Sequence, residues 1–379
     1  MIDSILAFLE HTGFAHLTWG NIIMFCVAFL LMYLAIKKRY EPFLLIPISL
    51  GIIMANIPPI ATNIFASPSG SMPGGLMWYI QRGLYLGIYP PVIFLGIGAL
   101  TDFSPLIANP KVLLLGAAAQ FGIFSTFIIA SLMGFDLRHA ASIAIIGGAD
   151  GPTSIFISSR FAPELLGVIA IAAYSYMALV PIIQPPIMRL FTTKRERMMR
   201  MKQLREVSKK ERMMFPIVVI LFCGLLVPQA LPLISMMMIG NFFRECGVVN
   251  RLAKTSSNAI LDTINIFLGI SVGATTRAEI FLTRQSLQII FLGAVAFAFA
   301  TASGVIFAKL MNLFLPNNKV NPLIGAAGVS AIPDSARVSQ MVAQRDDPSN
   351  FILMHAMGPN VAGVIGSALA AGIFLAMIK

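Results

Sequence analysis

Asp150 is an acidic residue in a glycine- and proline-rich stretch that interrupts an apolar segment. The stretch reads Gly147-Gly148-Ala149-Asp150-Gly151-Pro152-Thr153-Ser154, and residues 140–146 and 155–157 on either side are apolar except for Ser142. An acid at membrane depth is costly unless it faces a protein-lined cavity and meets a cation, a proton or a hydrogen-bond donor. The stretch therefore predicts a cation or proton site, and the competing interpretation is an ordinary turn at the aqueous surface.

The residues around Asp150 suit a hard cation. Pro152 fits the first position of a helix, so Asp150 lies at a helix start, where the backbone N–H groups stabilise an anion. Oxygen ligands suit Na⁺, Mg²⁺ or Ca²⁺, and one carboxylate among neutral oxygens favours a monovalent ion. We predict Asp150 as a Na⁺ ligand, with proton carriage as the competing role. Weaker candidate ligands are the hydroxyls of Thr153 and Ser154 and the backbone of Gly147 and Gly148.

The composition places these residues in a polytopic helical membrane protein. Of the 379 residues, 57% are hydrophobic and 11% are charged, and the mean hydropathy is +0.84. A water-exposed surface needs more charge than this, which excludes a soluble globule. Cys26, Cys223 and Cys246 are isolated and predict neither a disulfide framework nor a metal site. The N-terminus lacks the pattern of a cleavable signal.

The positive charge is concentrated in one loop. Residues 192–214 contain nine Lys or Arg against three Glu, within a net charge of +11. By the positive-inside rule this loop is expected in the cytoplasm, at the cytoplasmic (inner) membrane of the cell. The run has no interleaved aromatic residues and is flanked by membrane spans, so we expect no nucleic-acid partner.

Hydropathy divides the chain into five regions containing nine to eleven membrane-embedded elements. Residues 1–16 suit a helix lying on the membrane surface, and spans are expected at 17–36, 112–133 and 165–190, among others. The regions are 1–85 (interfacial helix, two spans and a loop), 86–191 (first repeat, broken at 147–154), 192–214 (basic loop), 215–258 (a proline-broken span and an amphipathic segment) and 259–379 (second repeat, broken at 320–342).

An internal duplication relates the two repeats. Residues 93–97 recur at 266–270, residues 115–117 recur at 292–294, and residues 148–158 (GADGPTSIFIS) align with 329–339 (VSAIPDSARVS). Two repeats with Gly/Pro-broken helices at matching positions point to a transport site at the repeat interface near the membrane midplane. Whether the second repeat is inverted relative to the first depends on whether the proline-broken residues 215–239 cross the membrane fully. The sequence leaves this open.

Other polar residues in the spans have two interpretations each. Arg337 aligns with Phe156 and can balance Asp150 or Asp334, hold a substrate carboxylate, or reach the membrane surface. Tyr174 and Tyr176 can relay a proton or anchor to a carbonyl. His355 and Asn360 in the last span predict helix-packing hydrogen bonds, and the small residues of 363–372 predict close helix contact.

The amino-acid sequences of four motifs resemble those of a known family. The strings GGADGPTSIF (147–156), AYSYMALVPIIQPPIM (173–188), IFLGIGALTDFSPLIANP (93–110) and NPLIGAAGVSAIPDSAR (321–337) resemble the β subunit of the biotin-dependent sodium-pumping decarboxylases. That group acts on oxaloacetate, methylmalonyl-CoA, glutaconyl-CoA and malonate. The resemblance runs from about residue 13 to the C-terminus, and the motif positions show no departure.

The resemblance implies a translocase that is a primary sodium pump. A partner subunit would present carboxybiotin, this chain would decarboxylate it with consumption of a proton, and Na⁺ would move outward. The implied partners are a biotin carrier, a carboxyltransferase subunit and a small membrane-anchor subunit. The implied fold has inverted repeats that form a scaffold and a mobile core, with an elevator-like movement in a homotrimer. The resemblance also implies that a partner subunit, and not this chain, carries the biotin.

The resemblance also assigns site residues. The catalytic set is Asp150, Tyr176 and Arg337, and the Na⁺ set is Asp150, Asn321, Gly325 and Ser330. The residues alone favour a Na⁺-coupled secondary carrier of organic acids, which would use the same broken helices and Arg337 without decarboxylase chemistry. A membrane interaction subunit with no chemistry is a further alternative.

Overall fold

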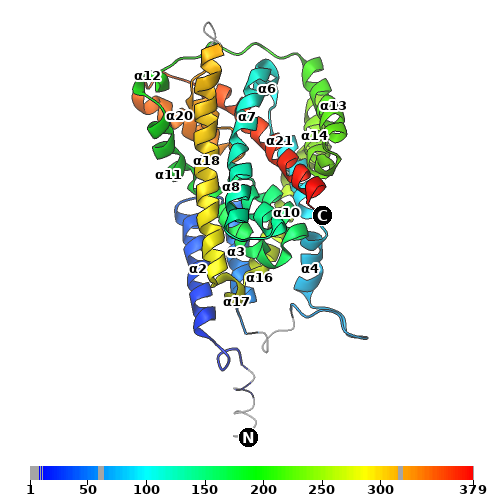
Figure 1. The fold of residues 1–379 in the computed structure, drawn as a ribbon. Coiled ribbons are helices and arrows are strands. Elements are labelled where there is room, and N and C mark those ends of the chain that lie inside the picture. Colours follow the sequence, from blue (N-terminus) through cyan, green and yellow to red (C-terminus); the bar gives the residue numbers. More distant parts are fainter. Residues whose placement is uncertain (1–7, 9, 11, 59–63, 315–318, 379) are drawn as a thin grey trace.

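The computed structural model describes residues 8, 10, 12–58, 64–314 and 319–378, which form helices joined by turns and loops, with no β-strand (Figure 1). The helices of the first half are α2 (Trp19–Lys37), α3 (Pro42–Ala55), α4 (Leu76–Tyr85), α5 (Tyr89–Leu100), α6 (Ser104–Ala108), α7 (Leu113–Ala119), α8 (Phe121–Leu132), α9 (Leu137–Ala144), α10 (Gly151–Phe161) and α11 (Leu166–Phe191). Those of the second half are α12 (Lys194–Arg197), α13 (Lys209–Leu226), α14 (Leu231–Cys246), α15 (Asn250–Thr255), α16 (Leu261–Thr275), α17 (Ala278–Phe281), α18 (Arg284–Phe314), α19 (Leu323–Ala326), α20 (Asp334–Asp346) and α21 (Leu353–Met377).

Six helical segments in the described residues are long and apolar enough to cross a membrane. They are Trp19–Lys37, Pro110–Leu132, Pro163–Phe191, Asn250–Thr275, Arg284–Phe314 and Leu353–Met377. The pair α4 and α5, bent by 68°, raises the number to seven. The expected all-α polytopic membrane protein is confirmed. The larger number of embedded elements expected from the sequence includes short and broken helices such as α3, α9 and α10.

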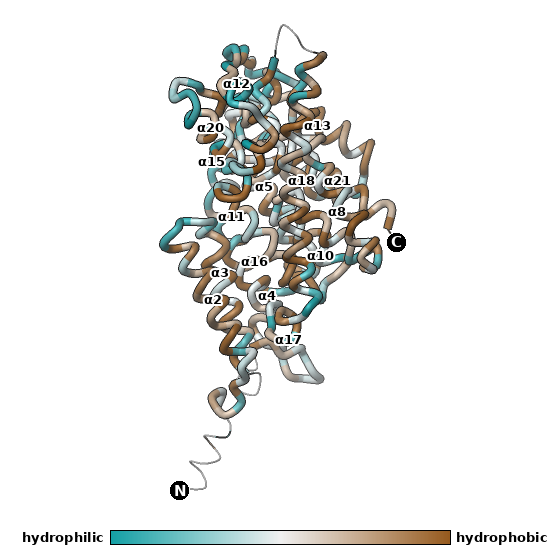
Figure 2. The backbone as a smooth tube through the Cα atoms, turned by 60° about the vertical axis from the view of Figure 1, so that its left-hand side comes forward, coloured by the Kyte–Doolittle hydropathy of each residue, from teal (hydrophilic) through white to brown (hydrophobic). Residues whose placement is uncertain are grey.

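The basic loop folds onto the end of the second half. Arg197 pairs with Asp346 at 2.5 Å and Arg200 pairs with Asp347 at 3.0 Å, which ties the loop to the C-terminal end of α20. Figure 2 shows hydrophilic residues gathered around α12 and α20 at one end, whereas hydrophobic residues predominate along α2. The surface helix expected at residues 1–16 falls largely outside the described residues.

The same order of elements occurs in both halves. In the first half, α5 precedes the span Pro110–Leu132, the broken segment α9–α10 and the long helix α11. In the second half, α16 precedes the span α18, the broken segment α19–α20 and the long helix α21. The sequence segments that recur in the two halves occur in the same order along the chain as these elements. The symmetry that relates the halves stays a prediction.

Each of the two repeats expected at 86–191 and 259–379 packs against a helix that precedes the other repeat in the chain. Helix α3 packs along α16, and α14 packs along α5. Both contacts are backbone-close: a Cβ on Gly51 would lie 2.4 Å from the carbonyl oxygen of Ile270, and one on Gly240 would lie 2.0 Å from that of Leu95. Small residues permit this approach between helices in a membrane. Residues 215–239, predicted as one broken span, form α13 and α14, which pack against each other.

Candidate functional site

The break before α10 positions the Asp150 side chain. Helix α9 passes into a 3₁₀ turn (Ile145–Gly148), Ala149 adopts φ +49°, and Asp150 becomes the N-cap of α10. Pro152 is the second residue of the helix, one position later than predicted, because Gly151 takes the first. The backbone N–H of Thr153 donates to Asp150 Oδ1 at 3.2 Å. An N-cap carboxylate satisfies a backbone donor that has no partner within the helix, so the local sequence fixes the direction of the acid.

The Asp150 carboxylate is buried among hydroxyl groups. Its side chain is 5% exposed, and its Oδ2 atom accepts hydrogen bonds from Thr153 Oγ1 and Ser367 Oγ, each at 2.7 Å. None of the ion pairs within the described part of the chain involves Asp150. A buried carboxylate with only neutral donors has an uncompensated charge, which a bound cation or a proton would balance.

The second break contacts the first directly. The backbone N–H of Ser330 donates to the carbonyl oxygen of Gly148 at 3.0 Å, and the Ser330 hydroxyl donates to the same oxygen. The Ser330 hydroxyl also lies 3.5 Å from Ser367 Oγ. Residues from α10, the second break and α21 therefore meet within one hydrogen-bonded group, while a transport site at the repeat interface stays a prediction.

Asn360 holds the second break in place. Its Nδ2 donates to the carbonyl oxygens of Ala327 at 3.0 Å and Val329 at 2.9 Å, and to Ser335 Oγ at 2.8 Å. This is the helix-packing role that the sequence predicted for Asn360. Its Oδ1 is buried without a hydrogen-bond partner among the described residues. An orphaned buried acceptor is unfavourable unless a cation or a water molecule supplies a partner, so this oxygen fits an oxygen-based cation site.

A cavity of about 660 Å³ adjoins Asp150 and Ser330. Its lining includes four carboxylates, those of Glu41, Asp102, Asp150 and Asp262, and no Lys or Arg. Low-dielectric walls that carry one sign of charge concentrate ions of the opposite sign. Glu41 lies between α2 and α3, outside the candidate spans. Burial, followed by repulsion from Asp334, raises the pKa of Glu41 to about 7.

Tyr174, rather than Tyr176, shares this cavity with Asp150. Tyr174 is fully buried, its hydroxyl has no hydrogen-bond partner among the described residues, and it lines the same cavity. The ring packs on the start of α10, because a Cβ on Gly151 would lie 2.1 Å from Tyr174 Cε1. Tyr176 donates instead to the carbonyl oxygen of Ile290 on α18. Its role in the catalytic set stays a prediction from the resemblance.

Three other predicted residues lie apart from Asp150. Asn321 donates to the carbonyl oxygens of Arg197 at 3.0 Å and Met199 at 2.8 Å and caps Leu323. Gly325 lies at a crossing with α18, where a Cβ would be 2.1 Å from the Gly304 carbonyl oxygen. Arg337 is exposed and pairs with Asp334 at 3.4 Å. In this conformation none of the three contacts the carboxylate, and their roles as ligand or catalytic group stay predictions.

Ser367 and Glu41 are site residues that the sequence did not reveal. Ser367 lies in the small-residue run 363–372, where a serine is as consistent with helix packing as with a ligand. Glu41 follows Lys37, Lys38 and Arg39 and looks like an ordinary surface acid. Only the tertiary structure shows that Glu41, just before α3, lines the cavity beside Asp150 and that Ser367 on α21 donates to it.

Comparison with known proteins gives a consistent result over the whole chain. A model of the family described as the Na⁺-transporting oxaloacetate decarboxylase beta subunit matches residues 20–378. The chain is 56% identical over 396 aligned residues to the methylmalonyl-CoA decarboxylase subunit beta of Propionigenium modestum, with all of both chains covered. It is 54% identical over 377 residues to the glutaconyl-CoA decarboxylase subunit beta of Acidaminococcus fermentans, covering 100% of this chain and 98% of that protein.

A third relative extends the range of substrates. The oxaloacetate decarboxylase beta chain 2 of Salmonella typhi is 48% identical over 428 aligned residues, with 99% of each chain covered. Two of the three relatives are therefore named for acyl-CoA decarboxylases and one for the decarboxylase of a free dicarboxylic acid. All three are beta subunits similar to this chain over nearly its whole length.

Proposed function

This chain belongs to the family of Na⁺-transporting oxaloacetate decarboxylase beta subunits, and from that membership we propose how its site works. It is the membrane subunit of a sodium-transporting decarboxylase. In the proposed cycle a partner subunit presents carboxybiotin, this chain promotes its decarboxylation with consumption of one proton, and Na⁺ is exported.

The observation that carries the proposal is the uncompensated Asp150 carboxylate. It is buried, it has hydroxyl and backbone donors only, and it adjoins a cavity lined by further carboxylates. Na⁺ and a proton satisfy the same charge, so the two compete for one position. Exchange between them links proton consumption to Na⁺ movement. The Ser330 hydroxyl and, once its contact with Ser330 opens, the Gly148 carbonyl are candidate Na⁺ ligands. Asn360 Oδ1, which has no hydrogen-bond partner among the described residues, is a further candidate.

The chemical step balances with a single proton. The bond between the carboxyl carbon and the ureido nitrogen breaks, CO₂ leaves, and the electron pair stays on the nitrogen, which takes the proton. Loss of solvent around the carboxylate favours this step. Tyr174 lines the cavity and is the phenol best placed to orient or donate the proton there, with Asp150 as the proton reservoir. Tyr176 and Arg337 remain the assignments that the resemblance supplies.

The coupling has to perform work against the membrane potential. Moving one charge against 100 mV requires about 2.3 kcal/mol, before any concentration gradient. The repeats, moving as a core against a scaffold, are the proposed route for alternating exposure of Asp150.

The setting and partners follow from the same proposal. The subunit lies in the cytoplasmic membrane with loop 192–214 in the cytoplasm, where a biotin carrier and a carboxyltransferase subunit reach it. A small membrane-anchor subunit and two further copies of this chain complete the assembly. The relatives differ in the acid they are named for, so we assign the choice of acid to the carboxyltransferase partner.

The experiment uses the assembled complex in proteoliposomes. CO₂ release and ²²Na⁺ accumulation are measured together while external Na⁺ is varied. Na⁺-dependent CO₂ release coupled to ²²Na⁺ movement is expected. Uptake of a free organic acid with Na⁺, without CO₂ release, would support the secondary carrier instead and overturn the proposal.

A further inference from the structure

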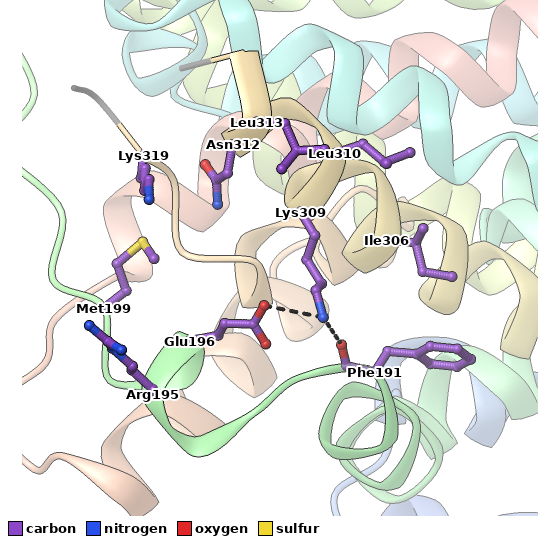
Figure 3. Close-up of a pocket in the computed structure, with 10 residues that line it drawn as sticks. All are labelled: Phe191, Arg195, Glu196, Met199, Ile306, Lys309, Leu310, Asn312, Leu313 and Lys319. Atoms are coloured by element: carbon purple, nitrogen blue, oxygen red, sulfur yellow. Dashed lines mark hydrogen bonds and ion pairs between the residues drawn. The ribbon is translucent and has the colours of Figure 1, made fainter. Parts of the chain in front are cut away.

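A second hollow, of about 850 Å³, lies where α11 and α18 end (Figure 3). The candidate spans Pro163–Phe191 and Arg284–Phe314 both finish at this end of the molecule. The basic loop begins directly after Phe191. The hollow is therefore at the boundary between the membrane and the aqueous side that carries the basic loop.

The polar side of the hollow has more positive than negative charge. Lys309 on α18 reaches Glu196 Oε1 at 3.1 Å and donates to the Phe191 carbonyl oxygen at 3.2 Å (Figure 3). Arg195 on α12 and Lys319 after α18 also line the hollow. In the part of the chain that the structure describes, neither forms an ion pair. Two cations are thus left without a counter-charge beside one satisfied pair.

Glu196 does not neutralise these two cations. Burial acts to raise its pKa, but hydrogen bonds from the Thr193 backbone and Lys309, among others, lower it below the ordinary value. Glu196 therefore stays ionised and bound to Lys309. An amine group from a zwitterionic molecule finds no free carboxylate here.

The other side of the hollow is an apolar stripe. Ile306, Leu310 and Leu313 are 40%, 48% and 74% exposed and lie on one face of α18, because their spacing of four and three residues follows the helical repeat. Ile306 and Leu310 project on the side of Figure 3 away from Arg195 and Lys319. The hollow therefore combines a cationic end with an apolar wall.

We propose that this hollow binds an anionic phospholipid. The phosphate group lies against Arg195 and Lys319, and an acyl chain lies along Ile306, Leu310 and Leu313. Basic pockets between transmembrane helices bind anionic lipid headgroups. A soluble anion would leave the apolar stripe unused, and a zwitterionic lipid would leave the two cations without a net counter-charge.

The test measures lipid binding to the purified full chain by native mass spectrometry. Phosphatidylglycerol and phosphatidylcholine with identical acyl chains are titrated separately after removal of co-purified lipid. We expect about thirtyfold preference for phosphatidylglycerol in the unmodified protein, given about 1 kcal/mol for each of the two cations near the surface. Equal binding of both lipids would overturn the proposal without reference to any variant.

A matched pair of double variants locates the site. Arg195→Gln with Lys319→Gln is expected to abolish the preference, whereas Lys202→Gln with Lys210→Gln removes the same charge from the basic loop outside the hollow and is expected to retain it. A preference that survives the first pair, or that both pairs lose equally, would contradict the assigned position.

Two further measurements distinguish a bound lipid from two other occupants of the hollow, a soluble anion and a second copy of this chain. Glycerol phosphate has the headgroup without chains and is expected to leave phosphatidylglycerol bound; complete displacement would indicate a soluble-anion site. A Leu313→Cys variant in a Cys26→Ser background is expected to remain free of disulfide-linked dimers on oxidation. Rapid dimer formation would show that a second copy covers this face and would overturn the lipid assignment.

Discussion

The carbonyl oxygen of Gly148 accepts hydrogen bonds from both the backbone N–H and the hydroxyl of Ser330. Gly148 immediately precedes the turn that aims Asp150, and Ser330 lies in the break of the other half. The two broken segments are therefore joined at the point where the acid is placed. In this conformation the Gly148 carbonyl is engaged, so its use as a Na⁺ ligand requires the Ser330 contact to open.

Asp150→Asn should abolish both activities of the complex. The amide keeps the size of the side chain but removes the charge that binds Na⁺ or a proton. We expect Na⁺-dependent CO₂ release and ²²Na⁺ accumulation to fall by at least about 100-fold. Glu279→Gln, at an exposed position outside the cavity, is the matched control. Full coupled activity in Asp150→Asn would exclude the central role of this acid.

Ser367→Ala should weaken Na⁺ binding. The hydroxyl donates to Asp150 Oδ2 at 2.7 Å, and a hydrogen bond to a charged group contributes about 1.5–3 kcal/mol. Its loss favours the protonated acid, so the Na⁺ concentration for half-maximal CO₂ release should rise about tenfold, and more at acidic pH. Ser49→Ala, which removes a buried hydroxyl bound to the Leu45 carbonyl, should leave this concentration unchanged. An unchanged value in Ser367→Ala would remove Ser367 from the site.

The two tyrosines should respond differently to loss of the hydroxyl. Tyr176→Phe breaks the hydrogen bond to Ile290 and should cost about 1 kcal/mol of stability, while the protein stays folded and turnover slows. Tyr174→Phe removes a hydroxyl without a partner, so we expect unchanged thermal stability and a changed rate or Na⁺ dependence. Thermal unfolding and steady-state kinetics of both variants test this. Unaltered kinetics in Tyr174→Phe would exclude it from the proton route.

Glu41→Gln should alter pH dependence. With a pKa of about 7 in the folded protein, Glu41 binds its proton more tightly when folded than when unfolded. Stability therefore decreases as pH rises from the ordinary carboxyl pKa through about 7. The variant should lack this decrease, so its melting temperature relative to the unmodified protein should be higher at pH 8 than at pH 5. Parallel curves across this range would contradict the assignment.

Gly325→Ala should destabilise the second break through packing. A Cβ at this position would lie 2.1 Å from the Gly304 carbonyl oxygen, and the reciprocal distance is also 2.1 Å. Because both neighbours are backbone, we expect a loss of about 1–3 kcal/mol and impaired activity together. Gly224→Ala, where the new Cβ would meet only the flexible end of the Leu231 side chain (Cδ1 at 2.9 Å), tests whether any glycine substitution within a helix has this effect. A stable, Na⁺-insensitive Gly325→Ala variant would support a direct ligand role instead.

The helical membrane fold and the position of the main acid are predictable from the sequence. Long apolar runs have few alternatives in a bilayer, because every backbone group must be hydrogen-bonded. The Gly/Pro cluster locates the break, and Pro152 lies one residue after the start of α10. Asp150 and Ser330 line one cavity and are connected through Ser367, while the duplication itself stays a prediction.

The rest of the site depends on packing that no local pattern encodes. Ser367 reaches Asp150 from a position 217 residues away, and a lone serine in a run of small residues has no distinguishing signal. Tyr174 and Tyr176 are two residues apart on a helix, so they face different directions. The sequence alone therefore cannot decide which one faces the cavity.

The packing of α3 from the first half against α16 from the second half has a consequence for biosynthesis. Asn56, directly after α3, donates to the Thr276 carbonyl oxygen at 2.8 Å and accepts from the Ala278 backbone N–H, 222 residues further along the chain. The side of α3 that carries Gly51 is made long before α16 exists to cover it. The first half therefore has no complete partner surface while it emerges from the ribosome. Expressed as two separate polypeptides divided in the basic loop, the halves should each be short-lived and should accumulate only when co-produced.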